Sequence, residues 1–402
     1  MKAVILCAGL GTRLRPITNT IPKVMIPIGG KPLLQHHIEW LVGNGIRDIG
    51  INLFYLPEVV VDYFGDGSKF GARIHYSHQK TLSETASGFK NFKDFVGNES
   101  CLIVYGDNMF DLSVSDFSDY HKKKGGLATI ALKEWENPGS KGIVGLDKEE
   151  KILWFREKPQ PHEITTNVGN AGIYIVEPEI FSFIPSDRDY DFGKDIFPAL
   201  LNEGKFIYGY HLQGYHIDIG SPEALVKARE DYKILFPNKA IFIDRDGVLN
   251  RKPREHDYVK NFSEFFWNDG AQDLIKEFKT RGFLVIVISN QQGIAKGKVS
   301  EKFIEDLHKK MNEDLKTIGT NIDGFYYCPH LESEGCVCRK PSPGLLFKAE
   351  YDYKIDMSRS FMIGDSKSDI EVGDRAGCFT IQIETDLIGG RSVLDKIMQR
   401  DK

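Results

Sequence analysis

The sequence lacks the features that would place it in a membrane or on a nucleic acid. It has no apolar run long enough to span a bilayer, and its apolar start, residues 3–7, is too short for the core of a secretion signal. It has no basic block, and 52 Lys and Arg against 57 Asp and Glu give a net charge of −5. We therefore expect a cytoplasmic protein without nucleic-acid or membrane partners. A homo-oligomer stays open.

Cysteine is also scarce, and repeats are missing. Six Cys in 402 residues do not form a disulfide framework, and no internal repeat or low-complexity segment interrupts the chain. What the sequence does have is apolar side chains, which make up 41% of the residues and are ample for packed cores. At this length two domains are the natural expectation.

Short apolar runs alternate with helical patterns, which predicts an α/β fold with largely parallel sheets. The first part is expected to hold strands at 3–7, 48–53, 101–105, 128–132 and 171–176, and helices at 31–44 and 112–124. The pattern restarts with strands at 240–243, 283–289 and 360–363, and helices near 270–279 and at 301–316. We therefore predict two domains, residues 1–236 and 237–402. His36 and His37 fall in a helical pattern and are expected at the surface rather than on a metal.

A glycine-rich turn follows the first expected strand. Gly9, Gly11 and Thr12 let backbone N–H groups approach a polyphosphate, because glycine has no Cβ. Arg13 and Lys23 add cations that can offset the charge of a triphosphate. By itself such a turn is an ordinary connection after a strand, so segments further along the chain decide its meaning.

Those segments follow in order and complete a resemblance to the sugar-1-phosphate nucleotidyltransferases over roughly residues 1–235. The matching segments are Gly9-x-Gly11-Thr12-Arg13, Pro22-Lys23, Tyr105-Gly106-Asp107-Asn108, Glu157-Lys158-Pro159, Asn170-Ala171-Gly172-Ile173-Tyr174 and His216-Ile217-Asp218-Ile219-Gly220-Ser221. The resemblance implies a Rossmann-like domain in which Asp107 and Asp218 hold Mg²⁺ against the α-phosphate of a nucleoside triphosphate. A sugar phosphate oxygen would attack in line, and pyrophosphate would leave.

The resemblance also implies roles for single residues. Its catalytic cations are Arg13 and Lys23, its nucleotide-binding residues are Ala8, Gly9, Gly11, Thr12, Gln79 and Thr85, and its sugar-phosphate-binding residues are Gly106, Lys158 and Asn170. Gln79 stands where relatives place a base-reading Gln or Glu. Its amide can pair with uracil or thymine, whereas a carboxylate better suits the two donors of guanine. Gln79 therefore leaves the nucleobase open.

A second chemical motif stands past the middle of the chain. Asp244 and Asp246 follow the apolar run 240–243, so both carboxylates emerge at the carboxyl end of a strand, where ligands bind in open α/β sheets. One carboxylate can attack phosphorus while the other handles the proton of the leaving group. A carboxylate that attacks a phosphate dianion needs a cation, so a metal ion is expected.

With later segments this motif resembles the haloacid-dehalogenase phosphatase superfamily over residues 238–402. The segments are Asp244-Arg245-Asp246-Gly247, Ser289-Asn290, Arg339-Lys340-Pro341 and Gly364-Asp365-x-x-x-Asp369. The resemblance implies a Rossmannoid domain with nucleophile Asp244, general acid and base Asp246, and Mg²⁺ on Asp244, Asp365 and the Asp246 carbonyl. It implies that Ser289, Asn290, Arg339 and Lys340 bind the substrate phosphate. Ser366 stands where some relatives carry a substrate-binding Lys, and the sequence leaves open whether Lys367 replaces it.

Three Cys crowd into eleven residues with one His, namely Cys328, His330, Cys336 and Cys338. Three thiolates and an imidazole suit a closed tetrahedral Zn²⁺ site, and the zinc should be structural because no ligand position is left open. A reduced cluster without metal is the alternative. With this loop, the second part resembles the D-glycero-D-manno-heptose 1,7-bisphosphate 7-phosphatases and the related histidinol-phosphatases.

The two resemblances fit consecutive steps of one pathway, since the product of such a phosphatase is a substrate for such a transferase. We expect heptose 1,7-bisphosphate, heptose 1-phosphate and a nucleoside triphosphate as substrates. GTP and the α-anomer are favoured, because heptose guanylyltransferases belong to the transferase family. One alternative activates another sugar 1-phosphate with UTP, dTTP or CTP, beside a histidinol-phosphatase-like domain. Another is a regulatory subunit that has lost catalysis.

Overall fold

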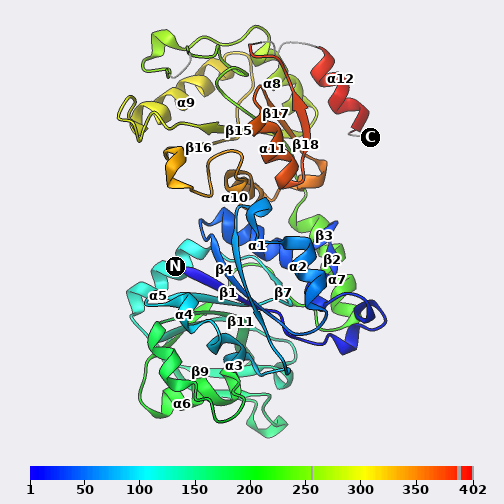
Figure 1. Ribbon diagram of the computed structural model, residues 1–402, viewed down its shortest axis with the longest axis vertical. Helices are drawn as coiled ribbons and strands as arrows, with labels where there is room; N and C mark the ends of the chain where they lie inside the picture. The colour runs from blue at the N-terminus through cyan, green and yellow to red at the C-terminus, as the bar shows by residue number, and fades with distance from the viewer. Residues whose placement is uncertain (255–256, 387–390, 401–402) are drawn as a thin grey trace. The chain divides into compact units, whose positions relative to one another are not determined.

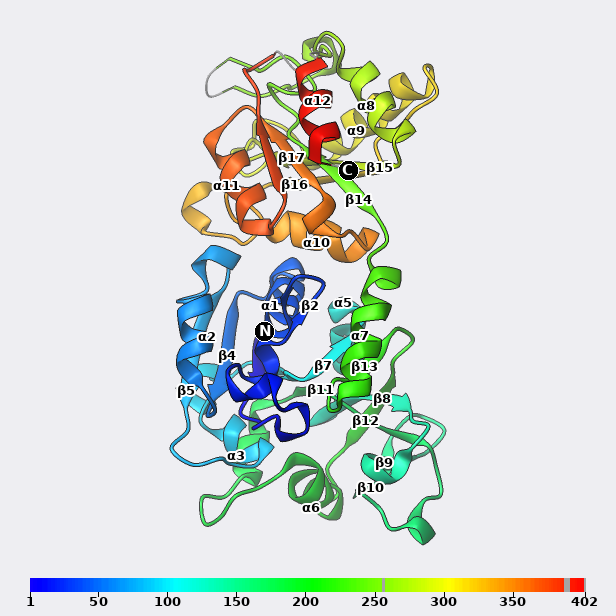
Figure 2. The same ribbon diagram turned by 90° about the vertical axis from the view of Figure 1, so that its right-hand side faces the viewer.

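The computed structural model describes residues 1–254, 257–386 and 391–400, and the chain divides into two compact units (Figures 1 and 2). The first unit is made mainly of residues 1–232 and the second mainly of residues 233–402. Each has its own sheet and its own buried core. In the described ranges, no helix combines the length and the apolar character needed to cross a bilayer.

A nine-stranded mixed sheet forms the centre of the first unit, counted over the described residues. The strands pair in the order β10 (Ile152–Glu157), β9 (Gly142–Leu146), β11 (Val168–Val176), β6 (Cys101–Tyr105), β1 (Lys2–Leu6), β4 (Asp48–Leu53) and β5 (Arg73–His78), and β8 (Ala128–Glu134) joins β11 to β12 (Ile207–His211). The strands from β6 to β5 run parallel, but β11 is antiparallel to β6, β8 and β9. The prediction of a largely parallel sheet is wrong for this unit, because β11 runs back along β6.

Helices and two small sheets complete the first unit. The helices are α1 (Leu33–Gly43), α2 (Pro57–Phe64), α3 (Thr85–Lys90), α4 (Lys93–Val96), α5 (Val114–Lys124), α6 (Phe197–Asn202) and α7 (Pro222–Leu235). The small sheets pair β2 (Pro27–Ile28) with β3 (Lys31–Pro32), and β7 (Asn108–Phe110) with β13 (His216–Asp218). In the second pair Asp218 lies opposite Asn108, so two segments far apart in the sequence meet directly after Asp107.

Local sequence explains where these elements begin and end. Ala3, Val4 and Ile5 are fully buried, as expected for a strand inside the parallel half of a sheet that is covered on both faces. Helix α5 begins after Ser113, whose side chain accepts a hydrogen bond from the Asp116 N–H, and ends at Gly125 in the left-handed conformation. The expected strands of this unit are present, with ends that shift by up to three residues.

Helix α1 departs from its sequence pattern, because nearly all of its side chains are buried. Its polar groups are paired inside the protein. Gln35 Nε2 donates to Glu39 Oε1 at 2.7 Å, Lys31 pairs with Glu39, and His37 Nε2 lies 2.6 Å from the Asn108 carbonyl oxygen. The prediction that His37 lies at the surface is therefore wrong, since buried polar groups that satisfy one another leave no trace in the periodicity.

The topology brings two loops of the first unit to one edge of the sheet. Strand β1 pairs with β4 on one side and with β6 on the other. The chain thus builds outward from β1 through β4 and β5, and later returns to the far side of β1 as β6. Such a reversal opens a crevice at the carboxyl ends of the two central strands. The glycine-rich turn follows β1 and Asp107 follows β6, so both lie at this crevice.

In the second unit the described sheet has five strands, all parallel, as predicted. They pair in the order β16 (Gly324–Cys328), β15 (Phe283–Asn290), β14 (Lys239–Ile243), β17 (Phe361–Gly364) and β18 (Phe379–Gln382). The helices are α8 (Ala271–Thr280), α9 (Glu301–Lys316), α10 (Gly344–Tyr353), α11 (Lys367–Ala376) and α12 (Arg391–Arg400). The strand order reverses between β14 and β17, whose carboxyl ends lead into Asp244 and Asp365.

Candidate active sites

A cavity of about 600 Å³ lies at the carboxyl end of β1. Among the residues that line it are Ala8, Gly9, Lys23, Ser83, Thr85 and Asp107. The turn after β1 and the start of α3, which the sequence predicts to bind a nucleotide, thus face one space. Its volume is within the range of roughly 300–1,000 Å³ that small-molecule sites occupy.

Gly9 and Gly11 lack a side chain for different reasons. A Cβ on Gly9 would meet no atom of the described residues within 4 Å, so its side faces open space. Gly11 has a φ of 61°, and a Cβ there would lie 3.0 Å from Thr18 Cγ2. Gly11 therefore shapes the turn, while Gly9 leaves the backbone approachable for a polyphosphate.

A second cavity, of about 480 Å³, shares Tyr105 and Asp107 with the first. The charged or amide side chains that line it are Arg13, Asp107, Asn108, Lys141, Glu157, Lys158, Asn170, Asp191 and Asp218. Cations suit a phosphate group, whereas carboxylate and amide oxygens accept hydrogen bonds from sugar hydroxyls. Burial, helped by the charge of Asp191, raises the pKa of Glu157.

Two lysines pair with the carboxylates at this cavity. Lys23 Nζ lies 2.6 Å from Asp107 Oδ2 and 3.7 Å from Asp218 Oδ1. Lys141 Nζ lies 2.6 Å from Asp218 Oδ2. Burial opposes ionisation of Asp218, but the charges of Lys141 and Lys23 outweigh it and hold the pKa of Asp218 below its ordinary value. Each carboxylate is therefore held beside a lysine ammonium group.

The donor set at this place fits a divalent cation. Mg²⁺ prefers carboxylate oxygens. The Asp218 Oδ1 atom is buried and accepts no hydrogen bond within the described part of the chain. Pairing of β13 with β7 brings Asp218 beside the residue that follows Asp107. Asp107 and Asp218 are thus the residues that would hold the ion.

Two predicted side chains of this unit are fixed by internal hydrogen bonds. Thr85 Oγ1 donates to Asp191 Oδ2 at 2.7 Å and accepts from the Phe192 N–H at 3.0 Å. Asn170 Nδ2 donates to the Tyr174 hydroxyl at 2.7 Å. Thr85 therefore offers a ligand its backbone more readily than its hydroxyl, while Asn170 keeps one orientation at the cavity wall.

Other predicted residues of this unit stand in different settings. Lys158 is exposed and lines the second cavity, and Thr12 is exposed at the start of a short 3₁₀ helix, Thr12–Leu14. Gly106 lines neither of the two cavities described above, and a Cβ there would lie 2.8 Å from Cys7 Sγ. Packing against Cys7 therefore explains why this position is glycine.

The amide group of Gln79 is buried but unpaired. Neither its amide nitrogen nor its oxygen has a hydrogen-bond partner among the residues described, and the same holds for the Ser83 hydroxyl. A Cβ on Gly88 would lie 2.7 Å from Asn52 Nδ2 and 2.9 Å from Gln79 Nε2, so a larger residue there would require both amides to shift. A buried amide without partners costs free energy, and a ligand that pairs with it recovers that cost.

Sequence reasoning missed part of the second cavity. Trp135, Lys141 and Asp191 lie on three separate segments that the fold brings together. Nothing in their local sequence marks them. The Glu157 side chain could have been found, because it directly precedes Lys158 in a matched segment.

In the second unit a buried lysine links two carboxylates. Lys340 Nζ lies 2.7 Å from Asp244 Oδ1 and 2.6 Å from Asp369 Oδ1, and it donates to the Ile288 carbonyl at 2.9 Å. Burial alone would lower the pKa of Lys340, but the two carboxylates raise it. Burial raises the pKa of Asp244, against the charge of Lys340. Lys340 is thus held as a cation beside the predicted nucleophile.

The Asp246 carboxylate receives four N–H donors. Arg245, which is fully buried, donates from Nε to Oδ1 at 3.1 Å and from Nη2 to Oδ2 at 2.8 Å. Asn250 Nδ2 donates to Oδ1 at 3.0 Å, and Gln291 Nε2 donates to Oδ2 at 2.9 Å. These donors, Arg245 above all, outweigh burial and lower the pKa of Asp246. The carboxylate is therefore an oriented anion.

An acidic cluster beside Lys340 fits a second divalent cation. Asp244, Asp365 and Asp369 offer oxygen atoms that all lie within 4.8 Å of one another. Asp365 Oδ2 also accepts from Lys252 Nζ at 2.6 Å. Lys367, the candidate replacement for a substrate-binding lysine, is exposed and pairs with Glu371 at 3.5 Å. The lysine that lies beside Asp365 is Lys252. Asp369 belongs to the sequence motif, but the resemblance assigns it no role. In the structure it pairs with Lys340.

The other predicted phosphate-binding residues of this unit differ in their partners. Ser289 is buried, and its hydroxyl accepts from Gln291 Nε2 at 2.8 Å. Asn290 Oδ1 accepts from the Lys340 N–H at 3.0 Å, and Asn290 Nδ2 donates to the Lys340 carbonyl at 3.2 Å, so Asn290 fixes the lysine backbone. Arg339 Nη1 is buried, and the described part of the chain offers it no partner.

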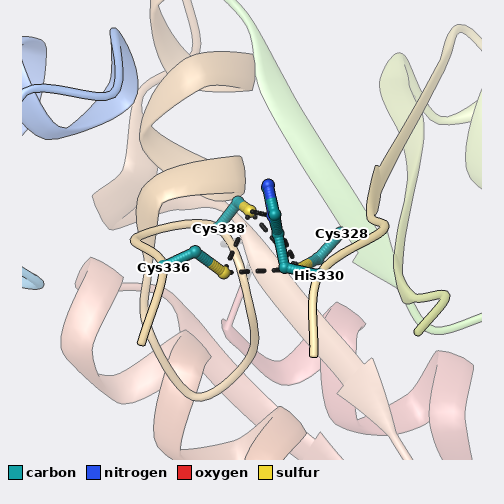
Figure 3. Close-up of side chains that lie close together, drawn as sticks. All are labelled: Cys328, His330, Cys336 and Cys338. Atoms are coloured by element: carbon teal, nitrogen blue, oxygen red, sulfur yellow. Dashed lines mark hydrogen bonds between the residues drawn. The ribbon is translucent and has the colours of Figure 1, made fainter. Parts of the chain in front are cut away.

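The Cys and His side chains after β16 converge on one point (Figure 3). Cys328, Cys336 and Cys338 have Sγ atoms 3.3–3.5 Å apart, and His330 Nδ1 lies 3.2 Å from Cys338 Sγ. A tetrahedral ion with Zn–S bonds of about 2.3 Å spaces its sulfurs by about 3.8 Å, close to these separations. The cluster fits zinc.

Removal of one thiolate should empty this site. Purified protein should hold about one zinc per chain, and Cys336→Ser should lose it. The segment that carries Arg339 and Lys340 then loses its anchor, so phosphate release should fall by at least about tenfold. Elemental analysis and a phosphate assay measure the two effects. Cys378→Ser, buried outside the cluster, should keep the zinc, and zinc-free Cys336→Ser with full phosphatase activity would contradict the prediction.

Family profiles match both units. The profile of the nucleotidyl transferase family matches residues 2–234, more than half of the chain, and the protein belongs to this family. A HAD-hydrolase-like profile matches residues 337–397, so the second unit carries a HAD-like domain. The two fold assignments made from the sequence are thereby confirmed.

Known relatives align with the first unit. The chain is 39% identical over 233 residues to UTP–glucose-1-phosphate uridylyltransferase of Synechocystis sp., covering 55% of this chain and 60% of that protein. It is 33% identical over 232 residues to mannose-1-phosphate guanylyltransferase of Mycobacterium tuberculosis, covering 58% and 64%. A Bacillus anthracis structure described as a glucose-1-phosphate thymidylyltransferase with a sucrose matches with a TM-score of 0.53 and 28% identity, over 57% of this chain and 94% of that one. The chain therefore spans less than two thirds of each of the two sequence relatives.

Proposed function

We propose that this chain is a bifunctional enzyme of nucleotide-activated heptose synthesis, with a transferase domain in residues 1–236 and a phosphatase domain in residues 237–402. The second domain removes the C7 phosphate of D-glycero-D-manno-heptose 1,7-bisphosphate. The first transfers a nucleotidyl group, GMP from GTP, to the resulting heptose 1-phosphate and releases pyrophosphate. Nucleoside triphosphates are cytoplasmic metabolites, which favours that compartment.

The observation that supports the transferase half most strongly is the meeting of two cavities at Asp107. A triphosphate along the Gly9 backbone places its α-phosphate near Asp107, and a sugar phosphate enters beside Arg13 and Lys158. Lys23 and Arg13 offset the charge that builds as the sugar phosphate oxygen attacks and pyrophosphate departs. Mg²⁺ on Asp107 and Asp218 would polarise the α-phosphate.

In the phosphatase half, Asp244 attacks phosphorus and the bond from phosphorus to the sugar oxygen breaks, which leaves an aspartyl phosphate. Asp246, which Arg245 orients, must take up a proton before the first step. It passes that proton to the departing oxygen and regains one from the water that hydrolyses the aspartyl phosphate. Lys340 offsets charge on the transferred group. Mg²⁺ on Asp244 and Asp365 would reduce the repulsion between the carboxylate and the phosphate.

A second candidate substrate set rests on Gln79 and on the relatives. The unpaired amide of Gln79 can match the edge of uracil or thymine. One relative is a uridylyltransferase, another a guanylyltransferase. The competing function is therefore uridylyl, thymidylyl or cytidylyl transfer to another sugar 1-phosphate.

Nucleotide competition separates the two candidates. We expect kcat/KM with α-heptose 1-phosphate to be highest for GTP, by about tenfold to hundredfold over ATP, UTP, dTTP and CTP, since an unpaired buried polar group costs roughly 1–3 kcal/mol. Gln79→Glu should preserve that preference, because a carboxylate accepts from both donors of guanine. Gln213→Glu, an exposed change, is the control. If a pyrimidine triphosphate wins and Gln79→Glu abolishes its use, the guanylyl assignment is wrong.

The pathway assignment needs both substrates together. Heptose 1,7-bisphosphate incubated with each triphosphate in turn should release phosphate in every case. It should release pyrophosphate only with the correct nucleotide, and only after phosphate. Pyrophosphate release without prior loss of the C7 phosphate would break the proposed order.

A further inference from the structure

Lys141 is a cation at the second cavity that no motif explains. It directly precedes β9, and its side chain is only 22% exposed. Its ammonium lies 4.3 Å from the centre of the Trp135 ring and 2.6 Å from Asp218 Oδ2. The indole covers the ammonium from one side, so Lys141 is held at the cavity rather than spread over the surface.

The contact of Lys141 with Asp218 matches that of Lys23 with Asp107, also 2.6 Å. Both carboxylates that would hold a divalent cation thus carry an ammonium group in the free protein. An ion on Asp218 and the Lys141 ammonium compete for the same carboxylate, because each is stabilised by the same negative charge. The ion therefore displaces Lys141.

A displaced Lys141 has a partner within the same cavity. The Lys158 N–H donates to the Lys141 carbonyl at 3.0 Å, so the two lysines start from adjacent backbone positions, and both line the cavity. An ammonium that loses a carboxylate there is best stabilised by another anion. The sugar phosphate, which the proposed function places beside Lys158, is that anion.

We propose that Lys141 binds the sugar phosphate after a divalent cation takes Asp218 from it. This rests on the proposed transferase function and adds a phosphate-binding lysine to it. In the free enzyme Lys141 neutralises the metal site, and in the loaded enzyme it neutralises the substrate. Binding of the ion and binding of the sugar phosphate are thereby coupled, since the first frees the cation that the second needs.

The test combines an ion titration with kinetics for Lys141→Met. In an Asp365→Asn background, which weakens the acidic cluster of the second unit, Mn²⁺ should bind Lys141→Met roughly tenfold more tightly by electron paramagnetic resonance, because its competitor is gone. In the otherwise native protein, KM for α-heptose 1-phosphate should rise roughly tenfold to hundredfold, while KM for the nucleotide stays constant. Lys122→Met removes an exposed lysine and is the control.

Each result decides the proposal. Tighter Mn²⁺ binding together with a raised sugar-phosphate KM supports it. A raised KM with unchanged Mn²⁺ affinity overturns the exchange, and tighter Mn²⁺ binding with an unchanged KM overturns the phosphate contact. If the wild-type protein turns over neither heptose 1-phosphate nor glucose 1-phosphate with any triphosphate, the proposed function fails. In that case binding of inorganic pyrophosphate replaces the kinetic measurement. An unchanged pyrophosphate affinity in Lys141→Met overturns the proposal for Lys141.

Discussion

Asp244→Asn should abolish phosphate release and leave nucleotidyl transfer to a supplied sugar 1-phosphate nearly intact. The amide has the shape of the carboxylate and its oxygen can still accept from Lys340, so the second unit should fold. An amide is not a nucleophile for phosphorus, and loss of a nucleophile costs on the order of 10⁴-fold or more. Parallel assays of phosphate and pyrophosphate on one preparation measure both activities.

Asp107→Ala is the reciprocal variant. It removes one of the two carboxylates at the meeting of the cavities, and nucleotidyl transfer should fall by at least about hundredfold while phosphate release stays unchanged. The two activities should be independent because the acidic residues of each site belong to a single unit. Loss of both activities in either folded variant would contradict two chemically independent sites.

Lys340→Met should destabilise the second unit more than the removal of any one exposed side chain. The change leaves Asp244 and Asp369, with side chains 13% and 0% exposed, facing each other without a cation. Breaking a buried ion pair costs about 3–5 kcal/mol, so the free energy of unfolding of this unit should fall by about that much. Phosphate release should fall by at least about hundredfold.

Hydrogen exchange measures where that stability is lost. Without added Mg²⁺, amides of β14 and β15 in Lys340→Met should exchange faster, while those of β1 keep wild-type protection. Lys367→Met is the matched control, because Lys367 is 90% exposed and its pair with Glu371 should be worth less than about 1 kcal/mol. Wild-type protection of β14 in Lys340→Met would show that the two aspartates do not need this cation.

Polar residues that directly follow a buried strand could be predicted from the sequence. An apolar run that stops at a charged or glycine-rich turn fixes both the strand and the exit point of its side chains. Asp244 after β14 was found in this way, whereas Asp107 after β6 and Asp365 after β17 were assigned through the family resemblances. The Cys and His cluster was found because its four ligands lie within eleven residues.

Residues that depend on long-range contacts could not be predicted. Lys141 meets Asp218 across 77 residues, and no spacing encodes that approach. The link from Lys340 to Asp369 is similar, since it joins the loop between β16 and α10 to the first turn of α11. His37 was misjudged for a related reason, because its polar partner lies 71 residues away on β7.

The lysine partners of the acidic groups have a consequence for how the protein responds to metal supply. The pairs are Lys23 with Asp107, Lys141 with Asp218, Lys252 with Asp365, and Lys340 with Asp244 and Asp369. Because these anions are already paired, the protein should stay folded in a cell short of magnesium, and the proposed activities should return when the ion does. Loss of the proposed zinc would act differently. A lysine cannot replace an ion held by thiolates, so in newly made chains the loop that carries Lys340 would have no anchor.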